Sequence, residues 1–210
     1  MNEIHQIIEA VNREFAEKSE VRDKTLKLSR QLIQHCANTI RATHRREADQ
    51  AAELLRTANA IAAEMSAAAR QFADVYHAGY TQDALKELAE AHLTRALILG
   101  NDLPGPQALG VESAAYVNGL AEAVGELRRF ALDSLRRGEI ETAERMLNLM
   151  DDIYLSLTTV DFPAAITRDL RRKTDVARSI LERTRGDVTT AVRQEAMKKA
   201  LAAFEDRITR

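Results

Sequence analysis

The sequence predicts an all-α protein, folded as a single-domain antiparallel bundle of about seven helices over residues 1–210. Apolar residues recur at spacings of three and four, which is the helical period. Only eight glycines and three prolines interrupt the chain, and residues that lose little conformational freedom in a helix dominate its composition. With 45% hydrophobic and 30% charged residues, the composition excludes intrinsic disorder and a membrane-embedded fold, and it shows no break between domains.

The first third of the sequence predicts one long helix or two, from residue 2 to about residue 70. Residues 47–70 carry a stripe of apolar side chains that is rich in alanine, which suits close packing between helices. Gly79 interrupts the pattern. Thr81 is expected to act as the N-cap of a helix that runs to about Leu99, because its hydroxyl can accept a backbone N–H of the first turn.

The second half of the sequence is expected to begin with the main loop of the protein, since 103–110 is the only stretch rich in proline and glycine. This loop has room for one short helical turn. Gly138 and Gly186 lie where left-handed C-caps are expected, and Pro163 lies where a first helical residue is expected. The helices predicted around these residues span about 113–136, 139–159, 163–184 and 187–208.

Cellular context and redox chemistry follow from what the sequence lacks. A single cysteine, Cys36, excludes an internal disulfide and a cysteine-based zinc site, and we expect it to be a packing residue. No stretch approaches the roughly 20 apolar residues that span a bilayer, and the first residues do not resemble a signal segment, so a cytoplasmic protein is expected. The net charge of −2 gives no overall attraction to nucleic acid, so any such binding depends on local basic clusters.

Two pairs of carboxylates are candidate metal ligands. Glu87 and Glu90 are three residues apart on a helix that is apolar nearly all round, and Glu122 and Glu126 are four apart on one face of another helix. A buried carboxylate is costly unless a cation or several donors compensate it. Four carboxylates suit Mg²⁺ or Mn²⁺, and facing helices can assemble such a site. The alternative is that these acids face solvent, as most such pairs among 32 acidic residues do.

Two glycines interrupt the helix that carries the second acidic pair. Glycine inside a helix costs roughly 1 kcal/mol relative to alanine. Gly119 and Gly125 therefore indicate that a partner helix or a substrate approaches the backbone closely at both positions.

Several segments of the chain resemble the translin family, and within it the branch of translin-associated factor X (Trax). The segment Arg22–Arg30 is similar to the basic first helix of that branch, and Lys86–Ala91 (KELAEA) resembles its first acidic motif. The most specific match is Tyr116–Leu127 (YVNGLAEAVGEL), which is followed at the family's spacing by Gly138–Ile140. The resemblance implies a translin-like helical fold.

The resemblance also implies an activity and a set of site residues. It makes Glu87, Glu90, Glu122 and Glu126 both the metal ligands and the catalytic residues of an endoribonuclease that cleaves single-stranded RNA with Mg²⁺ or Mn²⁺. Glu122 stands where the family carries Asp, so its carboxylate is displaced by roughly 1.5 Å. Members of the family assemble into hollow oligomers, which implies a homo-octamer for this chain. Single-stranded DNA is a further ligand of the family.

A polyanion cannot be held by carboxylates alone, so a basic surface is expected near them. Aromatic residues make up only 4% of the chain, so little base stacking and slight sequence preference are expected. The candidate nucleic-acid-binding residues are Arg41, His44, Arg45 and Arg46, with Arg171, Arg172 and Lys173 as a weaker second cluster.

Two other functions are compatible with the sequence. One is a non-catalytic oligomer that binds single-stranded RNA or DNA, in which the acids pair with arginines such as Arg95 or Arg129. The other is a helical scaffold, for which no salt-dependent binding to oligonucleotides is expected.

Overall fold

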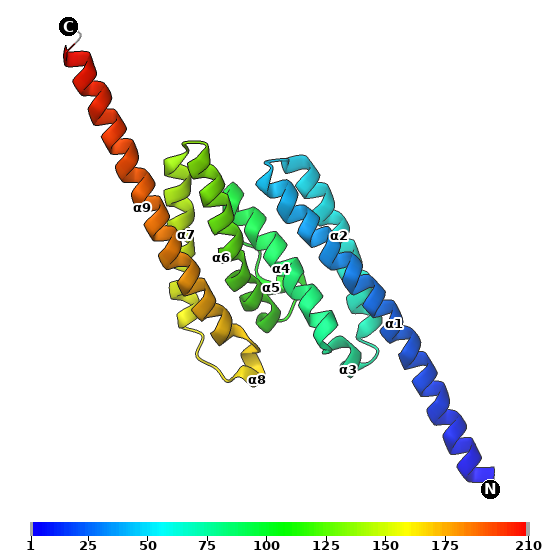
Figure 1. Cartoon of the computed structure of the whole chain (residues 1–210). Coiled ribbons are helices and arrows are strands. Elements are labelled where there is room, and N and C mark those ends of the chain that lie inside the picture. Colours follow the sequence, from blue (N-terminus) through cyan, green and yellow to red (C-terminus); the bar gives the residue numbers. More distant parts are fainter. Residues whose placement is uncertain (1, 209–210) are drawn as a thin grey trace. The chain divides into compact units, whose positions relative to one another are not determined.

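Our computed structural model describes residues 2–208, which form nine helices and the loops that connect them (Figure 1). Six are long and three are single turns, and these residues contain no β-strand. The all-α prediction is therefore confirmed. None of the helices in this range is both long and apolar enough to cross a membrane. The chain divides into two compact units: the described residues up to His92 with Pro104–Gly119, and Leu93–Leu103 with the described residues from Leu120 onward.

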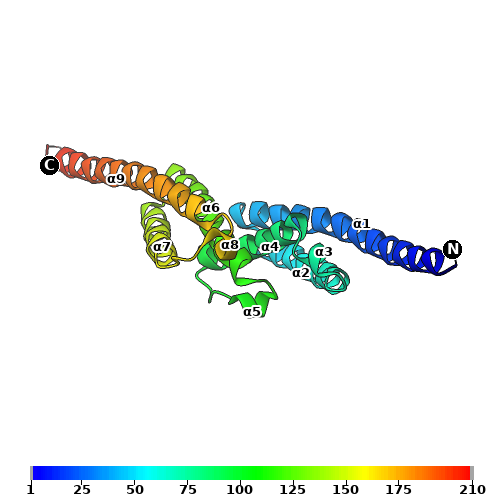
Figure 2. The ribbon, with the colours of Figure 1, turned by 90° about the horizontal axis from the view of Figure 1, so that it is seen from below.

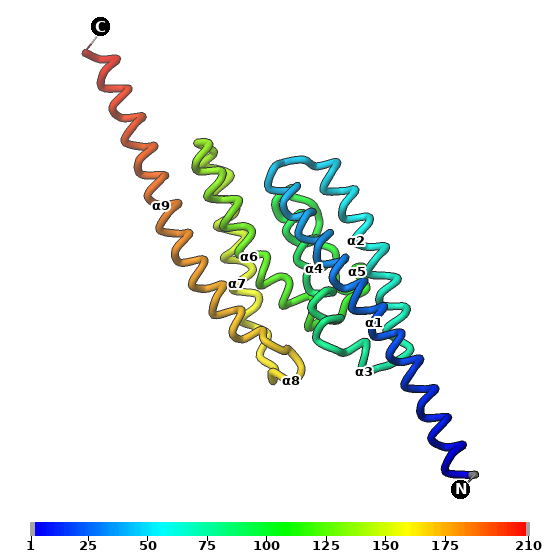
Figure 3. Tube along the Cα trace, turned by 45° about the vertical axis from the view of Figure 1, so that its right-hand side comes forward, coloured from blue at the N-terminus to red at the C-terminus, as the bar shows by residue number. Residues whose placement is uncertain are grey.

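The first unit is built on an antiparallel pair of helices, α1 (Asn2–His44) and α2 (Ala48–Ala69), which lie side by side in Figures 1 and 3. Alanine dominates the buried face of α2, and the small side chain lets the two backbones approach, as predicted. The buried apolar residues of α2 alternate at spacings of four and three, which is the pattern of a coiled-coil seam. They are Ala51, Leu55, Ala58, Ala62, Met65 and Ala69.

The first part of α1 runs past its neighbours in the same unit (Figure 2). Lys18 forms an ion pair with Asp74 in the short helix α3 (Ala73–Tyr76), and its ammonium lies 5.8 Å from the centre of the Phe72 ring. The residues before Lys18 carry a stripe of large apolar side chains that are 51–70% exposed. These side chains are Ile4, Ile7, Ile8 and Phe15.

The next helix, α4 (Gly79–Leu99), begins two residues before Thr81, so the prediction that Thr81 is its N-cap is wrong. The Thr81 hydroxyl instead donates a 2.8 Å hydrogen bond to the carbonyl of Val75. Gln82 donates to the carbonyl of Tyr76 in the same way, at 2.9 Å. Both side chains are almost fully buried, and their hydrogen bonds satisfy two carbonyls at the end of the preceding turn.

The proline-rich loop contains one helical turn, α5 (Pro106–Leu109), as predicted, and Gly110 ends it with a left-handed φ of 65°. The helix α6 (Ser113–Arg136) has the predicted bounds. Gly138 then adopts φ 77° before α7 (Ile140–Thr158), which confirms the predicted left-handed connection.

In the second unit, a short helix α8 (Ala164–Thr167) follows Pro163. Pro163 has extended backbone angles at the N-cap, so the helix begins one residue later than predicted. Arg168 then takes a positive φ of 59°, and α8 stops after a single turn. The prediction of one continuous helix from Pro163 is therefore wrong.

The last helix, α9 (Leu170–Ile208), packs on α7 and continues through Gly186, so the predicted break there is wrong. Contacts to Arg128 explain the continuity. Its guanidinium donates 2.9 Å to the hydroxyl of Thr184 and pairs at 2.9 Å with Asp187. These contacts lie on both sides of Gly186 and offset the roughly 1 kcal/mol that glycine costs inside a helix.

The C-terminal part of α9 carries a second stripe of exposed apolar residues. Their spacings of four, three and four place them on one helix face. Met197, Leu201, Phe204 and Ile208 are 55–68% exposed. The chain by itself leaves this face uncovered, as it does the stripe on α1.

A glycine brings α6 against α4. A Cβ atom added at Gly119 would lie 2.8 Å from the carbonyl oxygen of Lys86 and 2.9 Å from the backbone nitrogen of Glu90. Both distances are too short for any real side chain, so the predicted close approach at Gly119 is confirmed. At Gly125 an added Cβ would meet nothing within 4 Å, so no helix of the described chain approaches that backbone closely, and the approach of a substrate there stays a prediction.

These two glycines make a matched pair of alanine substitutions. Gly119→Ala is expected to lower the free energy of unfolding by about 1–3 kcal/mol, because the added methyl forces two backbones apart. Gly125→Ala is expected to leave it unchanged or to raise it by about 0.5–1 kcal/mol through helix propensity. Urea unfolding followed by circular dichroism, at one protein concentration, measures both values. Equal effects of the two substitutions would contradict the close crossing.

Candidate metal centre

Two carboxylates lie on α4, which is buried on nearly all sides, as predicted. Leu85, Leu88 and Leu93 are at most 1% exposed. Glu90 is 9% exposed, and the side chain of Glu87 is 27% exposed. The two acids therefore lie in surroundings of low polarity, where an uncompensated charge is costly.

A third carboxylate comes from α6. Glu122 follows Gly119 by three residues, so it lies about one helical turn beyond the close crossing and on a similar side of the helix. The backbone contact of Gly119 with Lys86 and Glu90 is therefore what aims Glu122 at α4.

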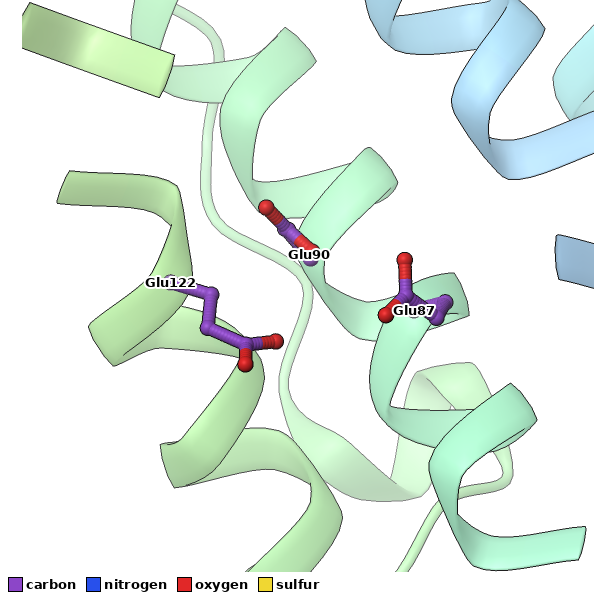
Figure 4. A group of neighbouring side chains, drawn as sticks. All are labelled: Glu87, Glu90 and Glu122. Atoms are coloured by element: carbon purple, nitrogen blue, oxygen red, sulfur yellow. The ribbon is translucent and has the colours of Figure 1, made fainter. Parts of the chain in front are cut away.

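Glu87, Glu90 and Glu122 bring their carboxylates together, and Figure 4 shows the Glu122 side chain extending from α6 toward the two acids of α4. One carboxylate oxygen from each residue lies within 4.8 Å of the other two. Two oxygens bound to Mg²⁺ at about 2.1 Å are at most about 4.2 Å apart. Three oxygens cannot all lie opposite one another, and oxygens at neighbouring positions of the octahedron are about 3.0 Å apart. Rotation about the flexible bonds of the glutamate side chains would therefore have to bring the oxygens about 1–2 Å closer to fit all three to one ion. The donor set is also the one that Mg²⁺ and Mn²⁺ prefer.

Glu126, the fourth acid of the sequence analysis, does not belong to this group. It lies one helical turn after Glu122 on α6, and its side chain is partly exposed. Among residues 2–208, the carboxylates close enough to share an ion here are those of Glu87, Glu90 and Glu122.

Two lysines compensate the charge of the cluster. The Lys86 ammonium lies 2.9 Å from a carboxylate oxygen of Glu87, and the Lys173 ammonium lies 3.1 Å from one of Glu122. The lysine side chains are only 15% and 14% exposed. Lys173 was predicted from the sequence to bind phosphate, whereas Lys86 was not predicted to have a role. Its position next to Glu87 in the chain was the only available signal.

The acids of α4 also act on the single cysteine, which lies on α1. Burial raises the pKa of the Cys36 thiol, and the charges of Glu87 and Glu90 raise it further. Cys36 has no exposed surface. It therefore remains a protonated thiol and serves as a packing residue, as predicted.

The first predicted basic cluster lies at the end of α1. Arg41, Arg45 and Arg46 are exposed, whereas His44 is only 8% exposed. Arg45 pairs at 2.6 Å with Glu47, which raises the pKa of the arginine and lowers that of the glutamate. Three of the four predicted residues are thus on the surface, and one is largely inside.

The basic cluster follows Cys36 on the same helix. Arg41 comes five residues after Cys36, which is roughly 8 Å along the helix axis. Cys36 is the residue of α1 whose pKa the charges of Glu87 and Glu90 raise, so the cluster lies further along α1 than the point that faces these acids.

The second predicted cluster does not present three free cations. Arg171 is exposed, but Arg172 pairs with Asp169 and Lys173 pairs with Glu122. The pairing with Asp169 raises the pKa of Arg172 and lowers that of Asp169.

Comparison with known proteins identifies a family whose matched region contains the candidate site. The sequence model of the Translin family matches residues 75–185, which include the three acids and both lysines. The uncharacterized protein MJ0175 of Methanocaldococcus jannaschii is 30% identical over 202 residues, which cover 96% of this chain and 88% of that protein.

Solved structures agree with this match. A crystal structure of AfC3PO is 35% identical with a TM-score of 0.77, over 88% of this chain and 96% of that one. A complex of AfC3PO with duplex RNA is 34% identical with a TM-score of 0.78, over 88% and 95%. Apo-NeC3PO, at 21% identity and a TM-score of 0.81 over 88% and 96%, shares the fold. On the family match and the relative that spans almost its whole length, this chain belongs to the translin family.

Proposed function

We propose that this protein is a Trax-like, metal-dependent endoribonuclease that cleaves single-stranded RNA as a hollow homo-oligomer, with eight copies as in the family it resembles. The observation that carries the proposal is the convergence of three carboxylate oxygens, from Glu87, Glu90 and Glu122, within 4.8 Å of one another. Carboxylate oxygens are ligands that suit Mg²⁺ or Mn²⁺, the ions of phosphoryl-transfer enzymes.

In this proposal, residues of the chain bind the ion and exclude bulk water. Glu87, Glu90 and Glu122 hold the ion, and the apolar residues around α4 limit the access of bulk water. Bound Mg²⁺ or Mn²⁺ would supply polarisation of the scissile phosphate and activation of a water molecule. No side-chain nucleophile is required, which agrees with the inert Cys36 thiol. We include Glu126 in the catalytic set because of the family resemblance.

RNA is the substrate class that the comparisons favour, because the AfC3PO relative has been solved with duplex RNA. We assign the phosphate contacts to Arg41, Arg45 and Arg46, which are exposed at the end of α1. His44 belongs to the same cluster, and as a mostly buried residue it supports the surface from beneath.

Assembly is supported by the two uncovered apolar stripes. Exposed apolar patches that run along a helix face mark protein interfaces. Residues 4–15 of α1 carry such a stripe on one broad helix face, and residues 197–208 of α9 carry one at coiled-coil spacing. A second copy of the chain is the partner that a homo-oligomer supplies.

A non-catalytic RNA-binding oligomer is the second candidate. The observation that favours it is that Lys86 and Lys173 already compensate two of the three carboxylates. In this role the cluster would stabilise the crossing of the helices and bind no ion. A divalent-dependent cleavage assay on single-stranded RNA separates the two functions.

Glu90→Gln tests the metal centre. This substitution keeps the size of the side chain and removes one ligand charge, so it is expected to lower divalent-dependent cleavage of single-stranded RNA by about a hundredfold or more. Glu126→Gln tests the fourth acid in the same assay. Glu182→Gln, an exposed acid on α9, is the control and should cleave like the wild type. Wild-type activity in a folded Glu90→Gln protein would contradict the assignment.

Arg46→Ser tests the RNA-binding surface. Loss of one phosphate contact is expected to weaken binding of single-stranded RNA and to reduce the slope of log Kd against log salt by about 0.7. Fluorescence anisotropy at several salt concentrations measures both. Arg178→Ser, an exposed arginine on α9, should leave the slope unchanged. Equal slopes for Arg46→Ser and the wild type would show that Arg46 does not contact a phosphate of the RNA.

Phe204→Asp tests the assembly. Placing a charge in the middle of the α9 stripe is expected to dissociate the oligomer, because a buried unpaired carboxylate is costly. Light scattering after size-exclusion chromatography gives the mass of the particles. Lys198→Asp, on the neighbouring exposed face, should preserve the wild-type mass. An unchanged mass for Phe204→Asp would exclude this stripe from the interface.

A further inference from the structure

Two lysines contact the acids of the metal centre and are themselves largely withdrawn from water. The Lys86 and Lys173 side chains are 15% and 14% exposed, and their ammonium groups lie 2.9 and 3.1 Å from Glu87 and Glu122. Lysine is rarely buried without a specific partner. In each case that partner is a carboxylate of the cluster.

The position of Lys173 is not explained by the stability of its own helix. It lies in the first turn of α9, directly after Arg171 and Arg172, and this turn contains no acidic residue. The N-terminal end of a helix carries a partial positive charge, which disfavours cations there. The charges of two acids therefore favour a lysine at this position: Asp169, which precedes the helix, and Glu122, which the ammonium of Lys173 contacts.

An ion and these ammonium groups would share the same carboxylates. A divalent cation bound by Glu87, Glu90 and Glu122 would add positive charge within a few ångströms of both lysines. The ion and the lysines therefore oppose each other at the cluster. A lysine has a flexible four-carbon stem and three donors, so its ammonium can turn from a carboxylate to a phosphate oxygen.

We propose that Lys86 and Lys173 are the counter-ions of the ion-free cluster, and that they transfer to the phosphate of the RNA when the divalent ion binds. This proposal rests on the proposed metal centre. It makes the two lysines substrate-positioning residues that lower the affinity for the ion in the absence of RNA. Ion and RNA then strengthen each other's binding, because the RNA removes the cation that competes with the ion.

The test is a titration of Mn²⁺ into the full-length protein without RNA, followed by electron paramagnetic resonance. Lys173→Met keeps the apolar stem and removes the charge, and it is expected to bind Mn²⁺ about tenfold more tightly than the wild type. With saturating Mn²⁺, its affinity for single-stranded RNA is expected to fall by about tenfold. Lys86→Met should behave in the same way. Lys199→Met, on the same helix as Lys173 and paired with Glu195 at 3.9 Å on the surface, should match the wild type in both titrations.

The outcomes separate this proposal from the metal centre on which it rests. If the wild type binds Mn²⁺ and Lys173→Met binds it equally or more weakly, the proposal is overturned while the metal centre stands. Unchanged RNA affinity in Lys173→Met would overturn the transfer to phosphate. No Mn²⁺ binding by the wild type would overturn both. Should Lys173→Met fail to fold, Lys173→Gln provides the neutral side chain, and Lys173→Arg, which keeps the charge, should retain the wild-type affinity for Mn²⁺.

Discussion

The close crossing of α4 and α6 at Gly119 is the constraint on which the candidate site depends. No side chain separates the two backbones there, since even a methyl group would lie within 3 Å of Lys86 and Glu90. The crossing fixes the distance between the helices, and the regular geometry of α6 then places Glu122 opposite the acids of α4. The cluster is thus a consequence of one missing side chain and of two uninterrupted helices.

The charges at this crossing are close to balanced within the protein itself. Three acids meet in surroundings where an isolated carboxylate would be unstable, and Lys86 and Lys173 neutralise two of them. The same arrangement serves two purposes. It keeps the ion-free fold intact, and it holds the three carboxylates together where a cation would bind.

The sequence predicted what depends on local pattern and failed where tertiary contacts decide. The bounds of α6 and the left-handed Gly138 follow from periodicity and from the conformational freedom of glycine, and both are confirmed. Gly186 was predicted to end a helix, but the contacts of Arg128 carry α9 through it, and these contacts join residues 56 or more positions apart. The acids on α4 and α6 could be chosen from spacing, apolar flanks and resemblance. The pairing of Glu122 with Lys173 could not be predicted, because nothing in the spacing of α9 indicates what its first turn contacts.

The apolar stripes at the start of α1 and at the end of α9 affect the solubility of the protein and the dependence of its stability on concentration. Side chains such as Ile4 and Phe204, more than half exposed in the single chain, lower its solubility and favour self-association. When association covers such residues, mass action makes the apparent stability of the fold depend on protein concentration. Residues of these stripes that are exposed in the single chain would then tolerate substitution as poorly as buried core residues do. Sequence variation in these two segments should therefore be small.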